Sequence, residues 1–155
     1  MPRSNVGRVD TTGVEVSPAL DLGHGLTFGG AYTYLGIQSH GGSGPVLRRP
    51  NNLMSAFVNY TSPSVFSDAD ALNARVDVFF VGNRPDVDPM TAMPATNPQY
   101  TRVDLALTYR LPWKVEGIAL QAFANVSNLF DRSYEEVLGF PALPINAICG
   151  LRATF

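Results

Sequence analysis

The last eleven residues, INAICGLRATF (Ile145–Phe155), alternate between two kinds of side chain. The odd-numbered positions are all apolar: Ile145, Ala147, Cys149, Leu151, Ala153 and Phe155. The even-numbered positions are small or polar, with the exception of Ile148. Because successive side chains of a strand point to opposite faces, this stretch predicts a β-strand with one apolar and one polar face.

The same period of two recurs along the chain and predicts six further strands. They lie at Val9–Leu20, Leu26–Tyr34, Asn52–Tyr60, Ala74–Asn83, Thr101–Leu111 and Ile118–Asn128. Several approach the ~9–11 residues that a tilted membrane-spanning strand needs, whereas most globular strands have ~5–6. No stretch has a convincing helical period. We therefore expect an all-β, antiparallel, up-and-down chain of about seven strands.

The connections between these strands alternate in length. Those around Gly23–Gly25, Ser62–Asn73 and Pro112–Gly117 are expected to be turns at one edge, and Ser39–Arg49, Arg84–Gln99 and Asp131–Pro144 to be loops at the other. Short turns on one side and long loops on the other are typical of outer-membrane barrels. A girdle of aromatic residues is expected near the strand ends, at Tyr32, Tyr34, Tyr60 and Tyr109. A soluble β-sandwich, with its apolar faces turned inward, is the alternative.

Composition excludes several classes of protein. The 155 residues are 15% charged with a net charge of −2, which gives no basic face for nucleic acid. The single cysteine, Cys149, excludes a disulfide framework. No apolar run approaches the ~20 residues of a spanning helix. The first ten residues contain no apolar core of a signal peptide.

Several short motifs occur in a definite order. The stretch Asn125–Tyr134, NVSNLFDRSY, resembles the N-x-x-N-L-F-D-x-x-Y segment of TonB-dependent outer-membrane receptors. Asn5-Val6-Gly7 followed by Gly13-Val14-Glu15 is similar to an upstream strand of the same barrels, and Ala31–Tyr34 and Leu47–Pro50 are similar to the next two landmarks. The resemblance covers nearly the whole chain and is nearest to the cobalamin and siderophore receptors.

This resemblance implies a barrel of about 22 strands around a plug domain, and uptake of a scarce ligand energised by TonB. A chain of 155 residues is too short for that barrel. We therefore expect residues 1–155 to be the C-terminal portion of the barrel domain, without the plug, as an open curved sheet or a small barrel in isolation. The implied location is the outer membrane of a Gram-negative bacterium, reached with a signal peptide that this stretch does not include.

The resemblance also implies partners: outer-membrane lipid, the barrel-assembly machinery, TonB through the plug, and an iron-siderophore or cobalamin ligand. Leu151, Ala153 and Phe155 are expected to form the signal that the assembly machinery recognises. In the long loops, the expected ligand contacts are Arg48, Arg49, Tyr134 and Phe140. Charges on the polar faces are expected to face the lumen and pair across strands: Arg75, Asp77, Arg102, Asp104, Arg110 and Arg152.

Nothing in the sequence indicates an enzyme. Asp77 and Asp104 are the only carboxylates that resemble a catalytic pair, and no nucleophile or base accompanies them. We expect no cofactor and no metal site. Two other functions stay open, a small autonomous outer-membrane barrel acting as an adhesin or anchor, and a soluble β-sandwich that binds a partner. Asn128–Arg132 is expected to be a turn in which Asn and Asp side chains bond to nearby backbone.

Overall fold

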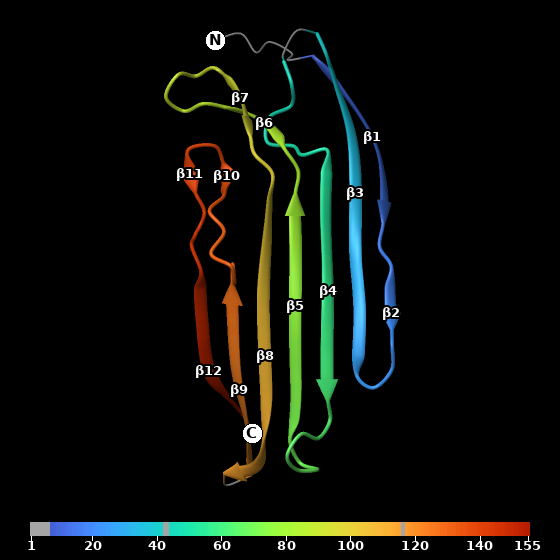
Figure 1. Ribbon diagram of the computed structural model, residues 1–155, viewed down its shortest axis with the longest axis vertical. Coiled ribbons are helices and arrows are strands. Elements are labelled where there is room, and N and C mark those ends of the chain that lie inside the picture. Colours follow the sequence, from blue (N-terminus) through green and yellow to red (C-terminus); the bar gives the residue numbers. More distant parts are fainter. Residues whose placement is uncertain (1–6, 42–43, 116) are drawn as a thin grey trace.

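A computed structural model describes residues 7–41, 44–115 and 117–155. The chain forms a single tall antiparallel sheet in the order β1-β3-β4-β5-β8-β9-β12, with β2 alongside β3 (Figure 1). These strands are β1 (Arg8–Val16), β2 (Ala19–Asp21), β3 (Leu26–His40), β4 (Asn52–Ser62), β5 (Ala71–Val81), β8 (Tyr100–Val115), β9 (Ile118–Ser127) and β12 (Asn146–Thr154). Two small hairpins complete the fold: β6 (Arg84–Val87) with β7 (Pro94–Asn97), and β10 (Glu135–Val137) with β11 (Phe140–Pro141). The described residues include no helix long and apolar enough to cross a membrane.

The predicted strands are confirmed, with differences at their ends. The first is divided into β1 and β2 because Pro18 lies between them and has no N–H to donate to the ladder. The carbonyl of Pro18 still accepts a hydrogen bond from the N–H of Gly30, 3.0 Å away. The second predicted strand corresponds to β3 and is longer than predicted. It pairs with β1 as far as His40, which lies opposite Arg8.

The connections lie where the alternation of their lengths placed them. The turns β2–β3, β4–β5 and β8–β9 lie at the lower edge of Figure 1, which we call the turn edge. The connections that carry β6–β7 and β10–β11, and the one between β3 and β4, lie at the opposite, loop edge. Because the seven long strands are all antiparallel, β1 and β12 run in the same direction.

The turn between β4 and β5 is organised by one buried carboxylate. Asp70 is fully buried and accepts hydrogen bonds from the N–H groups of Val65 and Phe66, at 2.7 and 2.9 Å. It also accepts one from the hydroxyl of Tyr109, at 2.8 Å. The predicted girdle residue Tyr109 is thereby fixed to the turn edge.

One face of the sheet is a continuous apolar surface. In register, Val58 lies opposite Val76, Val76 opposite Leu105, and Leu105 opposite Val126, which in turn lies opposite Ala147. No second layer covers this row, since Tyr100 is the only buried hydrophobic residue of the described ranges. A sandwich would bury this face against another sheet, so the sandwich alternative is wrong.

The opposite face carries paired charges. Asp77 and Asp104 lie directly opposite each other on β5 and β8, a placement that repels unless each charge is neutralised. An arginine two residues away on the same strand neutralises each carboxylate: Arg75 Nη2 is 2.7 Å from Asp77, and Arg102 Nη2 is 3.0 Å from Asp104. These four charges thus pair along each strand, and the expectation that they pair across strands is wrong. Arg110 and Arg152, which were expected to pair as well, form no ion pair within the described residues.

Close approach on the polar face explains one glycine. Gly29 on β3 lies opposite Phe57 on β4, whose ring covers it. A Cβ at position 29 would lie 2.6 Å from Cε1 of Phe57. The guanidinium of Arg75 lies on the same ring, 3.9 Å from its centroid. Gly29, Phe57 and Arg75 therefore form one stack across three strands.

We expect Gly29→Ala to lower the free energy of unfolding by about 1–3 kcal/mol, because the added methyl group must displace the Phe57 ring and, through it, Arg75. Gly36→Ala, on the same strand, is the control, since its Cβ would meet nothing closer than 3.5 Å. Urea unfolding of the two variants measures the difference. Equal stabilities would show that the stack is not close-packed.

Candidate functional site

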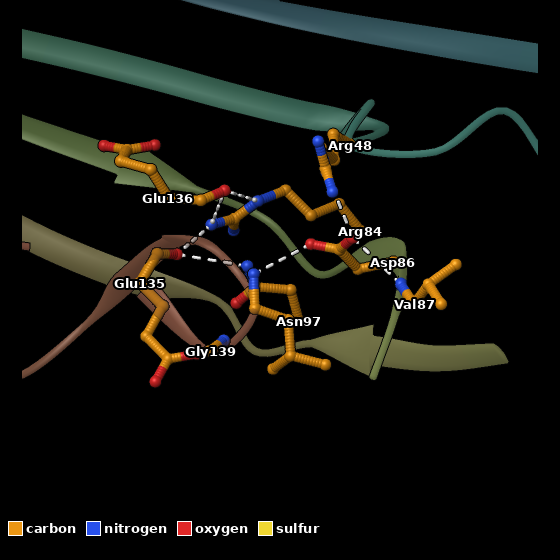
Figure 2. Close-up of polar contacts among 9 residues, drawn as sticks. Arg48, Arg84, Asp86, Val87, Asn97, Glu135, Glu136 and Gly139 are labelled. Carbon is orange, nitrogen blue, oxygen red and sulfur yellow. Dashed lines mark hydrogen bonds and ion pairs between the residues drawn. The ribbon is translucent and has the colours of Figure 1, made fainter. Parts of the chain in front are cut away.

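The loop edge contains a group of buried polar residues that joins all three of its connections. We call Arg48, Arg84, Asp86, Asn97 and the hairpin β10–β11 the loop-edge cluster (Figure 2). Arg84, Asp86 and Asn97 have exposed fractions of 3%, 0% and 1%. Buried charges and amides are costly unless they are bonded, so these three residues are stable only while the loops stay together.

Arg84 holds the hairpin β10–β11 by its backbone. Its Nη2 donates to the carbonyl oxygens of Glu135 and Glu136, the latter at 3.1 Å. Its Nη1 donates to the carbonyl of Pro98, at 3.4 Å, which ties β6 to the chain entering β8. The Nδ2 of Asn97 donates to the same Glu135 carbonyl, at 3.1 Å. Two side chains of the β6–β7 hairpin thus fix the start of β10 (Figure 2).

Asp86 joins the other two connections. Its Oδ2 accepts from the N–H of Leu138 at 2.9 Å, and its Oδ1 accepts from the N–H of Val87 at 2.9 Å and from Nε of Arg48 at 3.1 Å. The Leu138 bond lowers the pKa of Asp86 most; burial acts against it, and the Val87 and Arg48 bonds lower the pKa further, to about 2.

Two further contacts seat the hairpin on the sheet. Tyr134 stacks on Tyr100 with ring centroids 4.1 Å apart, and the Tyr100 hydroxyl donates to Oε1 of Glu136 at 2.6 Å. At the hairpin's turn, Gly139 has a φ of 84° and packs against the ring of Pro89 with no room for a Cβ. The hairpin is therefore held at its start, middle and tip.

The turn predicted after β9 is confirmed. The Oδ1 of Asn128 accepts from the N–H of Arg132 at 2.9 Å, and its Nδ2 donates to the carbonyl of Arg132 at 3.0 Å. Asp131 accepts from the N–H of Ile145 at 2.9 Å. The N–H of Asn128 also donates to Asp104 at 2.9 Å, which joins this turn to the charged residues of the polar face.

The structure brings together two of the four predicted ligand contacts. Arg48 and Phe140 line one concavity of about 570 Å³, together with Glu136, Val137, Pro141 and Ala142. Phe140 is 64% exposed there. Tyr134 does not line this concavity and is stacked on Tyr100, and Arg49 is exposed outside the concavity.

The other predicted residues fall into three groups by position. Tyr32 and Tyr34 lie on the apolar face toward the loop edge, and Tyr60 lies opposite Leu26, near the turn edge. Arg110 and Arg152 extend the polar face, where Arg152 Nη1 donates to Gln121 at 3.4 Å. Leu151 and Ala153 on β12, and Phe155 directly after it, are exposed. Within the described residues β12 pairs on one side only.

Sequence reasoning missed the residues that organise the site. These residues, which lie in connections expected to be irregular loops, are Arg84, Asp86, Asn97 and Glu136. Their bonds run to atoms far along the chain. One signal was available: Arg84–Val87 and Pro94–Asn97 flank a short turn-rich segment, as the strands of a hairpin do.

A model of the TonB dependent receptor-like β-barrel family matches residues 1–129. The chain belongs to this family. The first of its motifs, Asn5-Val6-Gly7, lies partly outside the described residues. The family consists of outer-membrane receptors of Gram-negative bacteria and is not a class of enzymes.

Solved structures of such receptors share the fold. FpvAI in its complex with pyocin S2 matches at a TM-score of 0.70 and 21% identity, over 92% of this chain and 19% of that one. P. aeruginosa FpvA bound to a heterologous pyoverdine and iron matches at 0.71 and 20%, with the same coverage. This chain thus spans about a fifth of the length of the receptors it resembles. None of the curated proteins matches it.

The lowered pKa of Asp86 predicts how acid affects the loop-edge connections. A carboxyl group whose pKa is lower in the folded than in the unfolded state stabilises the folded state at pH values above its unfolded pKa of about 3.9. This contribution is lost as the pH falls through the folded pKa of about 2. Pepsin should therefore cleave the loop-edge connections little at pH 4 and readily at pH 2. Asp86→Asn, which cannot accept from both Leu138 and Val87, should be cleaved readily at both pH values. Wild-type cleavage that matches the variant at pH 4 would contradict this prediction.

Proposed function

We propose that this chain forms part of the wall and loops of an outer-membrane receptor that takes up a scarce ligand, of the siderophore-iron or cobalamin class, with energy from TonB. The family match and the shared fold support the receptor class. The observation that carries the proposal is a single sheet with one unbroken apolar face, one charged face, and a preorganised cluster at its loop edge. Such a wall suits lipid on one side and a lumen on the other.

In this proposal the apolar face contacts outer-membrane lipid, with Tyr32 and Tyr34 at one interface and Tyr60 and Tyr109 at the other. Tyr34 lies eight positions after Leu26, the partner of Tyr60. At ~3.3 Å per residue this is about 26 Å along the strand, close to the ~25 Å apolar band of such barrels. The charged residues Arg75, Asp77, Arg102, Asp104, Arg110 and Arg152 then face the lumen.

The two outer strands suggest that the chain is one arc of a larger barrel. In the described residues β1 and β12 each pair on one side only, and they run in the same direction. Direct pairing of β1 with β12 would be parallel, so closure of an antiparallel barrel requires an odd number of further strands. An eighth strand drawn from the N-terminus would involve residues 1–6, which lie outside the described residues.

The partners follow from this placement. We propose that the assembly machinery recognises Leu151, Ala153 and Phe155 on the exposed last strand, whose free edge can pair with another strand. Coupling to TonB would run through a plug elsewhere in the longer protein. The ligand would contact the concavity between Arg48 and Phe140, and Arg49 and Tyr134 would contact it only if it extends beyond that concavity.

The lipid-facing assignment is tested by adding a charge to each face. Leu105→Arg, in the middle of the apolar row, should lower the free energy of unfolding in lipid vesicles by about 2–4 kcal/mol. Asn125→Lys, on the polar face opposite Ala106, should lower the free energy of unfolding much less. Urea titration in vesicles measures both. Equal losses would contradict the assignment of the faces.

The role of the loop-edge cluster is tested in the receptor that carries this chain. Arg84→Met keeps the length of the side chain but removes the bonds to Glu135, Glu136 and Pro98. We expect uptake of the receptor's ligand at limiting concentration to fall about tenfold, the equivalent of about 1.4 kcal/mol of binding energy. The amount of receptor in the outer membrane, measured by immunoblot, should not change. Unchanged uptake would show that the cluster does not position the ligand site.

A further inference from the structure

The concavity at the loop edge has an unequal distribution of charge. Two charged side chains line it, Arg48 and Glu136, among the apolar groups of Val137, Phe140, Pro141 and Ala142. The positive charge is partly matched, because Nε of Arg48 lies 3.1 Å from Oδ1 of the fully buried Asp86. The backbone of Arg48 is fixed as well, since its N–H donates to the Pro85 carbonyl at 2.7 Å.

The negative charge has no such match. Glu136 forms no ion pair with any residue in the described ranges. Its Oε1 accepts a hydrogen bond from the Tyr100 hydroxyl at 2.6 Å, and a neutral donor of this kind holds the carboxylate in place without cancelling its charge. Arg84 holds the Glu136 carbonyl at 3.1 Å, so the backbone that carries this side chain is fixed too.

The apolar part of the concavity offers a flat contact surface. Phe140 is 64% exposed, and it is followed directly by Pro141 in the same wall. An exposed aromatic face beside a carboxylate is an environment in which a cation attached to an apolar group makes two favourable contacts at once. An anionic group would meet the Glu136 charge and would compete with Asp86 for Arg48.

We propose that Glu136 determines the specificity of this concavity and selects a ligand group that carries a positive charge beside an apolar or aromatic moiety. This inference rests on the proposed function, because it names the chemistry of the group that enters the proposed ligand site. It also assigns the selectivity of the concavity to Glu136 and not to Arg48, the charged contact expected from the sequence. Glu136 acts by direct contact with the cation, whereas Asp86, Arg84 and Tyr100 act by positioning the two charged side chains.

Three probes of similar size and different charge test the proposal: 2-phenylethylammonium, 2-phenylethanol and 3-phenylpropionate. Their binding to the full 155-residue chain in uncharged detergent micelles is measured by saturation-transfer NMR. The ammonium ion should bind the wild type at least about tenfold more tightly than the propionate, a difference of about 1.4 kcal/mol. Glu136→Gln keeps an acceptor for Tyr100 and should abolish this preference.

Two further variants separate loss of the carboxylate from other effects. Glu15→Gln removes the same charge from the exposed strand β1 and should leave the preference unchanged. Ala142→Lys places a cation in the concavity wall and should reverse the preference in favour of the propionate. Far-UV circular dichroism confirms that each variant keeps its β-structure.

The proposal is overturned if the propionate binds the wild type as tightly as the ammonium ion, if none of the probes binds, or if Glu136→Gln retains the preference. Each of these outcomes leaves the proposed receptor function standing. Two other experiments decide that function. One compares the stability losses of Leu105→Arg and Asn125→Lys, and the other measures ligand uptake by the Arg84→Met receptor.

Discussion

The rest of this structure depends on the hydrogen-bond ladder of a single sheet with unlike faces. In hydrocarbon an unpaired N–H or C=O has no water to bond, so a chain that crosses it as strands must pair every strand with a neighbour. Pairing in register then decides everything else, because a slip of one residue would turn the row from Val58 to Ala147 onto the charged face. The ladder, the apolar surface and the charged face therefore all follow from the same register of strand pairing.

The loop edge obeys a different constraint. There the chain leaves the regular ladder, and its stability comes from buried polar groups that can be satisfied in only one arrangement of the loops. Arg84 bonds to carbonyls of residues more than fifty positions away, and Asp86 bonds to an N–H at a similar separation. Such bonds fix the residues that line the concavity between Arg48 and Phe140. A preorganised surface of this kind reduces the entropy that binding must overcome.

The long strands could be predicted from the sequence because their signal is local. Alternation in Thr101–Leu111 or Ile145–Phe155 reports which face each residue takes, and connection lengths report which edge each loop joins. The break at Pro18 was less visible, because the pattern continues on both sides of it. The loop-edge cluster could not be predicted, because Asp and Asn are common in exposed turns. The local sequence does not show that Asp86 and Asn97 are buried. Arg48 was expected in a long loop, but its ion pair with Asp86 was not, since that pair is brought together only by the folded loops.

The central claim, that the two faces of this sheet meet lipid and lumen, is tested most directly by accessibility along β8. In a Cys149→Ser background, single cysteines replace six consecutive residues and carry nitroxide labels in lipid vesicles: Val103, Asp104, Leu105, Ala106, Leu107 and Thr108. The account predicts that collision with oxygen, which concentrates in lipid, is high at the odd positions and low at the even ones. Collision with a water-soluble nickel chelate should follow the reverse pattern. Equal accessibility at odd and even positions, or nickel contact at Leu105, would contradict it.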